Sequence, residues 1–344
     1  MEINSLLRKN IAQIQPYSSA RDECKEWDRQ MVFLDANENP YQNGINRYPD
    51  PQQKKLKQKI AELKGVEEKQ ILLGNGSDEV LDLVFRVFCE PNVDNVITLP
   101  PTYGMYSVLA NLNAVKNKEV VLTTDFEPNI EAIINQVDEN TKIIFLCSPN
   151  NPTGNSFPEE SIEMLLNRFK GLVLLDEAYI DFSDKRSWIY RLCDYPNLII
   201  SQTFSKAYGM AGIRLGVLYA STEIISVLNQ IKPPYNINIL SQDKALQQLT
   251  KSKKVNVEIA NIKRNREDLI KELLEVKFIN KIFRTDANFL LVKVDDADKR
   301  YDQLLSKKIV VRNRSSQPLC DNCLRITIGT KKENNQLINA LKTM

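Results

Sequence analysis

Three polar clusters follow apolar runs in the middle of the chain, each where a buried strand should end. They occupy residues 148–154 (Ser-Pro-Asn-Asn-Pro-Thr-Gly), 176–179 (Asp-Glu-Ala-Tyr) and 201–209, and the last contains Lys206 and is followed by Arg214. Open parallel sheets bind ligands at the carboxyl ends of their strands. The clusters together would bring an amide, a carboxylate, a phenol, an amine and a guanidinium to one edge.

These groups fit the needs of one cofactor. A lysine that forms a Schiff base needs a carbonyl partner, and a pyridoxal ring needs a carboxylate that keeps its nitrogen protonated. Lys206 would supply the amine and Asp176 the carboxylate. A phenol and an amide suit the ring's phenolic oxygen, whereas a helix N-terminus, hydroxyls and a guanidinium suit its phosphate. The residues expected in those roles are Tyr179, Asn151, Ser77, Thr203, Ser205 and Arg214.

The composition removes several other kinds of chemistry. The 344 residues include no histidine, which excludes Ser-His-Asp and Cys-His catalysis and histidine-ligated zinc. Lys plus Arg number 46 and Asp plus Glu 44, so no charge excess favours nucleic acid or a membrane surface. No apolar run is long enough to span a bilayer, and no secretory signal is recognised. We expect a soluble protein of a reducing cytoplasm whose partners are small molecules.

Each motif also has a simpler interpretation. The apolar run before Asp176 could belong to a magnesium site of the Walker B type, but the chain contains no phosphate-binding P-loop. Residues 74–79 (Gly-Asn-Gly-Ser-Asp-Glu) could be an ordinary turn, although a strand-to-helix junction could also cradle a phosphate. Cys320 and Cys323 form a C-x-x-C pair that nothing completes into a zinc site, and no metal is assigned.

Short apolar strands and amphipathic helices must position these groups. The expected strands are 70–73, 94–99, 119–123, 142–147, 171–175, 197–202 and 214–219, and the expected helices among them are 77–89, 103–112 and 128–136. This alternation predicts an α/β fold with a parallel sheet. We divide the chain into an N-terminal arm (1–30), a large domain (31–240) and a small C-terminal α/β domain (241–344), with a long linking helix near 253–276.

The three clusters, in this order and with Ser-Lys-Ala-x-Gly-x-Ala-Gly-x-Arg at 205–214, resemble the fold-type I pyridoxal-phosphate aminotransferases. Further matches at 37–40, 47–50, 74–79, 101–106, 232–237 and 324–329 resemble the histidinol-phosphate aminotransferase family, over nearly the whole chain. The resemblance implies a large domain with a mainly parallel seven-stranded sheet flanked by helices. A smaller C-terminal α/β domain would complete the fold.

The resemblance also assigns roles to residues. Gly76, Ser77 and Asp78 would help to bind pyridoxal phosphate, Tyr103 would stack on its ring, and Tyr48 would reach the cofactor phosphate of the neighbouring subunit. The last role implies a homodimer with shared active sites. The residues that would bind the substrate anion are Tyr17, Asn151, Arg312 and Arg325.

Two of these residues, Arg325 and Arg312, can also be interpreted without the family resemblance. Arg325 lies in a short apolar strand, where an unpaired guanidinium would be costly, so an anion should meet it. Without the resemblance, Arg312 would be a solvated charge in a polar loop.

The resemblance implies transfer of the amino group of L-histidinol phosphate to 2-oxoglutarate through a Lys206 Schiff base, which is a step of histidine biosynthesis. Asp176 and Tyr179 would assist Lys206 in catalysis. The alternatives are an aromatic amino-acid aminotransferase and an enzyme similar to threonine-phosphate decarboxylase. A regulatory module that only binds the cofactor would need a DNA-binding appendage, and the sequence shows none.

Overall fold

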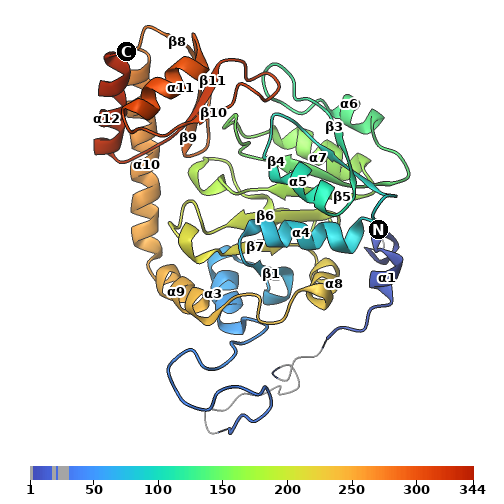
Figure 1. Ribbon diagram of the computed structural model, residues 1–344. Helices are drawn as coiled ribbons and strands as arrows, with labels where there is room; N and C mark the ends of the chain where they lie inside the picture. The colour runs from blue at the N-terminus through green and yellow to red at the C-terminus, as the bar shows by residue number, and fades with distance from the viewer. Residues whose placement is uncertain (1–2, 18–20, 22–30) are drawn as a thin grey trace.

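The computed structural model describes residues 3–17, 21 and 31–344 (Figure 1). Within the predicted arm, the interpretation of residues 18–20 and 22–30, which include Cys24, lies outside the described residues. The arm begins with η1 (Ile3–Leu6) and α1 (Lys9–Ala12). The Arg8 amide donates to the Val87 carbonyl of α4 (Ser77–Phe88) at 3.1 Å, and Ile3 and Ile11 are buried in the hydrophobic core that includes α4. The start of the arm is therefore packed against the main body.

A seven-stranded sheet forms the centre of the large domain, in the order β1-β7-β6-β5-β4-β2-β3. β7 runs antiparallel to both of its neighbours, and all other pairs are parallel. The strands are β1 (Ile71–Gly74), β2 (Asn95–Thr98), β3 (Lys116–Glu119), β4 (Thr141–Cys147), β5 (Leu172–Asp176), β6 (Leu198–Thr203) and β7 (Gly216–Tyr219). The predicted mainly parallel seven-stranded sheet is confirmed.

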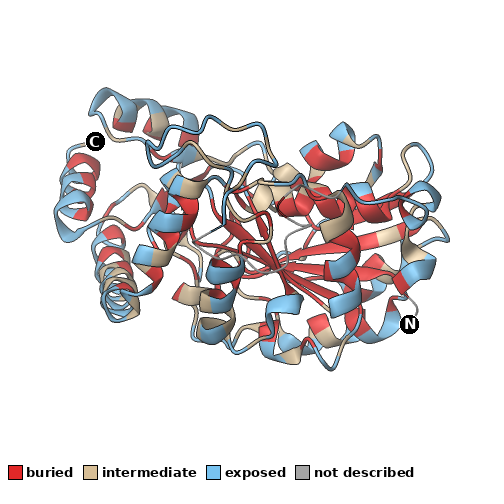
Figure 2. Ribbon diagram, turned by 90° about the horizontal axis from the view of Figure 1, so that it is seen from below, coloured by how far each residue is buried: buried red, intermediate tan, exposed pale blue. Residues whose placement is uncertain are grey.

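The central strands are buried on both faces, so their sequences are continuous apolar runs. Along β5, Leu172 and Leu174 enter one hydrophobic core while Val173 and Leu175 enter the other. Helices cover both faces and turn their exposed sides to solvent (Figure 2). They are α3 (Lys54–Lys64), α4 (Ser77–Phe88), α5 (Met105–Leu112), α6 (Ile130–Asn135), α7 (Glu159–Arg168), α8 (Thr222–Ile231) and α9 (Ile239–Leu249).

The smaller C-terminal domain is built on a second, antiparallel sheet in the order β10-β11-β9-β8. The long helix α10 (Ser252–Leu273) runs from the large domain to this sheet, where the sequence predicted a linking helix (Figure 1). The other elements are β8 (Ile279–Ile282), β9 (Phe289–Val294), α11 (Ala297–Ser306), β10 (Arg312–Asn313), β11 (Cys323–Thr327) and α12 (Lys331–Lys342). The division at residue 240 stays a prediction.

Some elements differ from the predicted ones. The strand predicted at 119–123 is β3 at Lys116–Glu119, a polar edge strand. The apolar residues Val120 and Leu122 misled the prediction, because they are buried in the core just beyond the ladder. The sequence analysis also assigned no element to α7 or to β8.

No helix among residues 3–17, 21 and 31–344 has the length and apolarity needed to cross a bilayer.

Candidate functional site

A pocket opens at the carboxyl ends of β4, β5 and β6, where the sequence placed the three polar clusters. It brings together ten of the predicted site residues: Ser77, Asp78, Tyr103, Asn151, Asp176, Tyr179, Thr203, Ser205, Lys206 and Arg214. Cys147, Ala178 and Ala211 complete the wall. The parallel register produces this convergence, because Cys147 of β4 lies beside Asp176 of β5, which in turn lies beside Ser201 of β6.

Asp176 is the buried carboxylate of the site. Its Oδ2 accepts a hydrogen bond of 2.7 Å from the Tyr106 hydroxyl, and its Oδ1 accepts one of 3.1 Å from the Ala178 amide. Burial raises the pKa of Asp176 to about 6, although both hydrogen bonds oppose the rise. A carboxylate held in this way is suited to a cationic partner, and its two existing hydrogen bonds fix its direction.

Sequence reasoning missed the role of Tyr106. This side chain is fully buried and stacks on Phe145, with ring centroids 5.0 Å apart. It lies in the 101–106 segment that contributed to the family resemblance. Its hydrogen bond to Asp176 joins residues 70 positions apart, and no local pattern in the sequence could have indicated that pairing.

Lys206 extends into the pocket, with its Nζ 5.8 Å from the centroid of the Tyr179 ring. The side chain is open to the pocket, yet desolvation by the surrounding walls lowers its pKa, and the positive charge of Arg325 lowers it further. A lowered pKa increases the share of neutral amine, which is the form that can act as a nucleophile or base. Lys206 is therefore the candidate reactive amine of this site.

Two tyrosines form the pocket walls beside Lys206. Tyr179 is buried and packs edge-on against Phe289 of β9, with centroids 5.1 Å apart. The Tyr103 hydroxyl donates to Asp78 at 3.0 Å. Burial raises the pKa of both phenols well above the ordinary value, so both stay protonated and can donate hydrogen bonds at neutral pH.

The turn that starts α4 forms an anion cradle with Arg214. Gly76 has a φ of +90°, and a Cβ atom there would lie 2.5 Å from Nη2 of Arg214. No side chain caps the α4 N-terminus, and the hydroxyls of Ser77, Thr203 and Ser205 belong to the same region. Exposed amides, hydroxyls and a guanidinium are the donors that a phosphate requires. These residues, Gly76 included, fit a phosphate group.

The backbone of Gly216 packs closely against the backbone of Gly76 and Ser77. A side chain at Gly216 should therefore disturb both the fold and the cradle. A Cβ atom at Gly216 would lie 2.2 Å from the Ser77 amide nitrogen, and backbone atoms cannot move aside cheaply. We expect Gly216→Ala to lower the free energy of unfolding by about 1–3 kcal/mol. It should also weaken pyridoxal phosphate binding by about tenfold, roughly the loss of one charge-assisted hydrogen bond. Gly212→Ala is the matched control, because a Cβ there meets nothing within 4 Å.

Thermal unfolding and cofactor titration of the two variants check this prediction. Equal effects of Gly216→Ala and Gly212→Ala would contradict it.

The small domain adds Arg325 to the site. Its Nη1 donates to Oδ1 of Asn151 at 2.5 Å, which joins β11 to the loop after β4. The Asp286 amide donates to the Gly154 carbonyl at 2.7 Å and holds the same loop against the small domain. Arg312 is exposed on β10 and pairs directly with Arg325 across the sheet. The two predicted arginines therefore lie side by side.

Five predicted residues do not line the pocket itself. Gly76 and Arg325 adjoin it through Arg214 and Asn151, and Arg312 pairs with Arg325. The other two, Tyr48 and Tyr17, lie apart from it. Tyr48 stacks on Tyr235, with centroids 4.5 Å apart, and lines a separate depression. Tyr17 is 76% exposed. Both side chains are thus available on the surface of the single chain, and their roles stay predictions.

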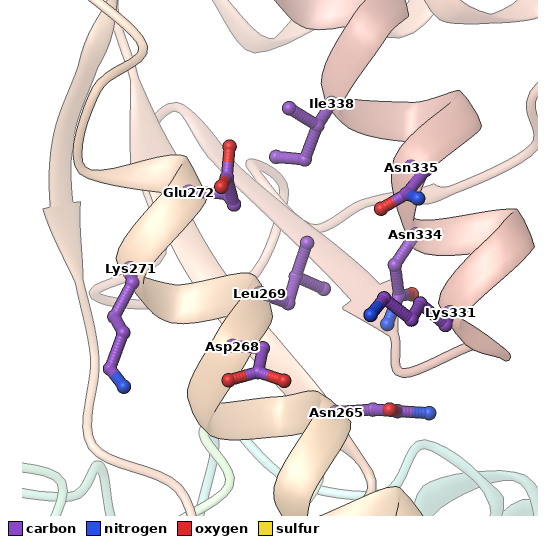
Figure 3. Close-up of a pocket in the computed structure, with 9 residues that line it drawn as sticks. All are labelled: Asn265, Asp268, Leu269, Lys271, Glu272, Lys331, Asn334, Asn335 and Ile338. Carbon is purple, nitrogen blue, oxygen red and sulfur yellow. The ribbon is translucent and has the colours of Figure 1, made fainter.

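Another depression lies between α10 and α12 (Figure 3). Its polar side chains have structural tasks: Asn334 accepts a hydrogen bond from the Gly329 amide, and Glu272 pairs with Lys342. It contains no cluster comparable to that around Lys206. The pocket at the carboxyl ends of β4, β5 and β6 is accordingly the candidate active site.

Fold and site define a fold-type I pyridoxal-phosphate enzyme. Residues 27–341 match the family model "Aminotransferase class I and II", and the chain belongs to this family. It is a pyridoxal-phosphate-dependent transaminase. The cofactor fit rests on the Gly76 cradle, the Asp176 carboxylate and the Lys206 amine of this chain.

Individual proteins of known name are similar to this chain in sequence and in structure. The chain is 63% identical over 344 residues to the histidinol-phosphate aminotransferase of Flavobacterium johnsoniae, covering 100% of this chain and 99% of that protein. The crystal structure of the Clostridium acetobutylicum histidinol-phosphate aminotransferase has a TM-score of 0.80 and 27% identity, covering 87% of this chain and 90% of that one. That of the Sinorhizobium meliloti enzyme with pyridoxal-5'-phosphate has a TM-score of 0.79 and 25% identity, covering 86% and 82%. The predicted resemblance is confirmed.

Proposed function

We propose that the enzyme transfers the amino group of L-histidinol phosphate to 2-oxoglutarate, producing imidazole acetol phosphate and L-glutamate in histidine biosynthesis. The main support is the arginine pair Arg312 and Arg325, joined through Asn151 to the pocket that contains Lys206. Such a pair suits a dianionic phosphate at one end of a substrate whose amine lies at Lys206. The name of the Flavobacterium johnsoniae relative supports the same substrate.

Several side chains would hold the cofactor. Lys206 would be its covalent attachment point, Asp176 would face the ring nitrogen, and Tyr103 would lie against the ring. Tyr179 and the Asn151 amide would donate to the phenolic oxygen, since Oδ1 of Asn151 accepts from Arg325 and its Nδ2 stays available to donate. The cradle of Gly76, Ser77, Thr203, Ser205 and Arg214 would bind the phosphate. Asp78 would contribute its backbone amide, because its carboxylate accepts from Tyr103 and pairs with Arg214.

Different side chains of the pocket would then have different roles in the amino-group transfer. When bound, pyridoxal phosphate supplies an electron-withdrawing ring that makes the neighbouring carbon-bound hydrogen acidic. Nζ of Lys206, once the substrate amine has replaced it in the covalent link, would be the free amine that takes this proton and gives it back on the cofactor side. Asp176 would keep the ring nitrogen protonated, while Tyr103 and Tyr179 would cover the pocket. Glutamate's carboxylates would use the same two arginines in the other half-reaction.

We also propose a cytoplasmic homodimer with shared active sites. The segment around Tyr48 exposes several large apolar side chains, namely Val32, Leu34, Tyr41, Ile45 and Tyr48. Tyr48 would reach the cofactor phosphate of the second subunit, and Tyr17 would close over substrate. Exposed apolar surface of this kind is typical of a subunit interface.

The test is a single-turnover experiment with cofactor-loaded enzyme and L-histidinol phosphate in the absence of a keto acid. We expect imidazole acetol phosphate in an amount equal to the active sites, followed by an equal amount of L-glutamate when 2-oxoglutarate is added. Mass spectrometry measures both products. Release of carbon dioxide from threonine phosphate, or turnover of phenylalanine alone, would reject this function in favour of the alternatives.

Arg312 provides a sharper check of the substrate site. We expect Arg312→Ala to raise the KM for L-histidinol phosphate at least about tenfold, the effect of losing one charged hydrogen-bond donor. The kcat should change little, because Arg312 lies away from the reacting carbon. Arg264→Ala, at an exposed arginine on α10, is the control. Unchanged KM in Arg312→Ala would remove this residue from the substrate site.

A further inference from the structure

A third arginine lies beside the pair already described. Arg314 directly follows β10, and its amide donates to the Cys323 carbonyl at 2.8 Å, two residues beyond the pairing of Arg312 with Arg325. Side chains alternate between the faces of a sheet, so residues two apart share one face. Arg312, Arg314 and Arg325 therefore lie on the same face of the small sheet.

The Arg314 side chain lacks the partners that usually accompany a guanidinium. Its Nε is buried and makes no hydrogen bond, and the same is true of the nearby Ser315 Oγ and Gln317 Oε1. Within the part of the chain that the structure describes, no carboxylate forms an ion pair with Arg312, Arg314 or Arg325. Of these three atoms, the Arg314 Nε and the Ser315 hydroxyl are donors, so this segment holds hydrogen-bond donors that an anion could accept from.

The charge of Arg314 interacts with charges and a phenol of the site. Burial lowers the pKa of Arg314, and the neighbouring charges of Arg325 and Arg312 lower it further. The positive charges of Arg325 and Arg314 also reach the Tyr179 phenol and oppose the rise of its pKa. Arg314 is thus one of the charges that act on Tyr179, which forms the pocket wall beside Lys206.

Three like charges repel one another, and an anion between them removes that cost. The stabilisation grows with the charge of the ligand, so a dianionic phosphate gains about twice what a carboxylate gains from each guanidinium. A second arginine would suffice for a carboxylate. A third guanidinium on this face therefore adds more to the binding of a dianion than to that of a carboxylate.

We propose that Arg314 is a specificity-determining residue that favours the phosphate substrate over the carboxylate substrate in this pocket. The inference rests on the proposed function, because it assigns the phosphate to the Arg312 and Arg325 site. Arg314 acts through substrate affinity and has no part in the proton transfer at Lys206.

The test compares Arg314→Gln with the unaltered, cofactor-loaded enzyme. We expect the KM for L-histidinol phosphate to rise about tenfold and that for L-glutamate to rise no more than about threefold, with kcat unchanged. Arg314→Lys, which retains the charge, should recover most of the phosphate affinity. Arg264→Gln is the control for loss of a surface charge.

Inorganic phosphate gives a readout independent of turnover. We expect its stabilisation of the cofactor-loaded enzyme against heat to need about tenfold more phosphate in Arg314→Gln. Equal changes in both KM values, or no change in either KM or phosphate protection, would overturn the inference. If the unaltered enzyme does not turn over L-histidinol phosphate but Arg314→Gln still weakens phosphate protection, the proposed function fails while the preference for phosphate stands.

Discussion

Lys206→Ala should reduce transamination by at least about 10³-fold, because it removes both the covalent attachment point and the base that moves the proton. The pocket keeps its other groups, so cofactor binding should persist without a covalent link. We propose that Asp176, Tyr179 and the Gly76 cradle, which lie at the same pocket, bind parts of the cofactor away from Lys206. Turnover and denaturing mass spectrometry after borohydride reduction measure the two effects.

Two further variants sharpen this result. Lys206→Arg retains a positive charge but cannot form the covalent link, so its turnover should also be lost. Lys170→Ala removes an exposed lysine and should behave as the unaltered enzyme. Turnover near normal in Lys206→Ala would refute the assignment, because no histidine in the 344 residues could take over the proton transfer.

The central part of the site could be predicted because strand ends and chemistry are both local signals. Asp176 ends β5 and Thr203 ends β6, so apolar runs followed by polar residues located them. The cradle at Gly76 was similarly visible as a strand-to-helix junction. The antiparallel direction of β7 was not, because a buried antiparallel strand has the same apolar composition as a parallel one.

Long-range side-chain contacts could not be predicted. No sequence pattern indicated that Tyr106 would support Asp176. The family resemblance assigned Arg325 and Asn151 to one anion site, but it did not indicate that the Arg325 guanidinium would donate to the Asn151 side chain, 174 positions away. Arg314 received no role in the sequence analysis, because only the pairing of β10 with β11 shows that it shares a face with Arg325.

Asp176→Asn should reduce turnover by about 10²-fold or more, since the amide cannot keep the ring nitrogen protonated. The same change should stabilise the cofactor-free protein. The introduced amide would retain an oxygen that accepts from the Ala178 backbone N–H, and its NH₂ could donate to the Tyr106 hydroxyl, so the local hydrogen bonds survive. Function and stability are therefore expected to change in opposite directions.

The pH dependence follows from the raised pKa of Asp176. The folded chain binds this proton more tightly than the unfolded chain, with a pKa of about 6 against 3.8. Below about pH 4 the group is protonated in both states and costs nothing. As the pH rises from about 4 to 6 the folded state loses stability, on the order of 3 kcal/mol by about pH 7. Asp176→Asn removes this loss, so its cofactor-free Tm should exceed that of the unaltered protein near neutral pH, with the gain disappearing below about pH 4.

Cofactor binding should reverse the order of stability. A protonated ring nitrogen beside Asp176 supplies the positive partner that the buried carboxylate lacks, so the unaltered protein should gain more Tm from pyridoxal phosphate than Asp176→Asn does. Asp125→Asn, at an exposed carboxylate, should change neither Tm nor turnover. A cofactor-free Asp176→Asn protein less stable than the unaltered one at neutral pH would show that Asp176 is held for folding. The expected result instead shows a carboxylate that is costly in the cofactor-free pocket because catalysis requires its charge.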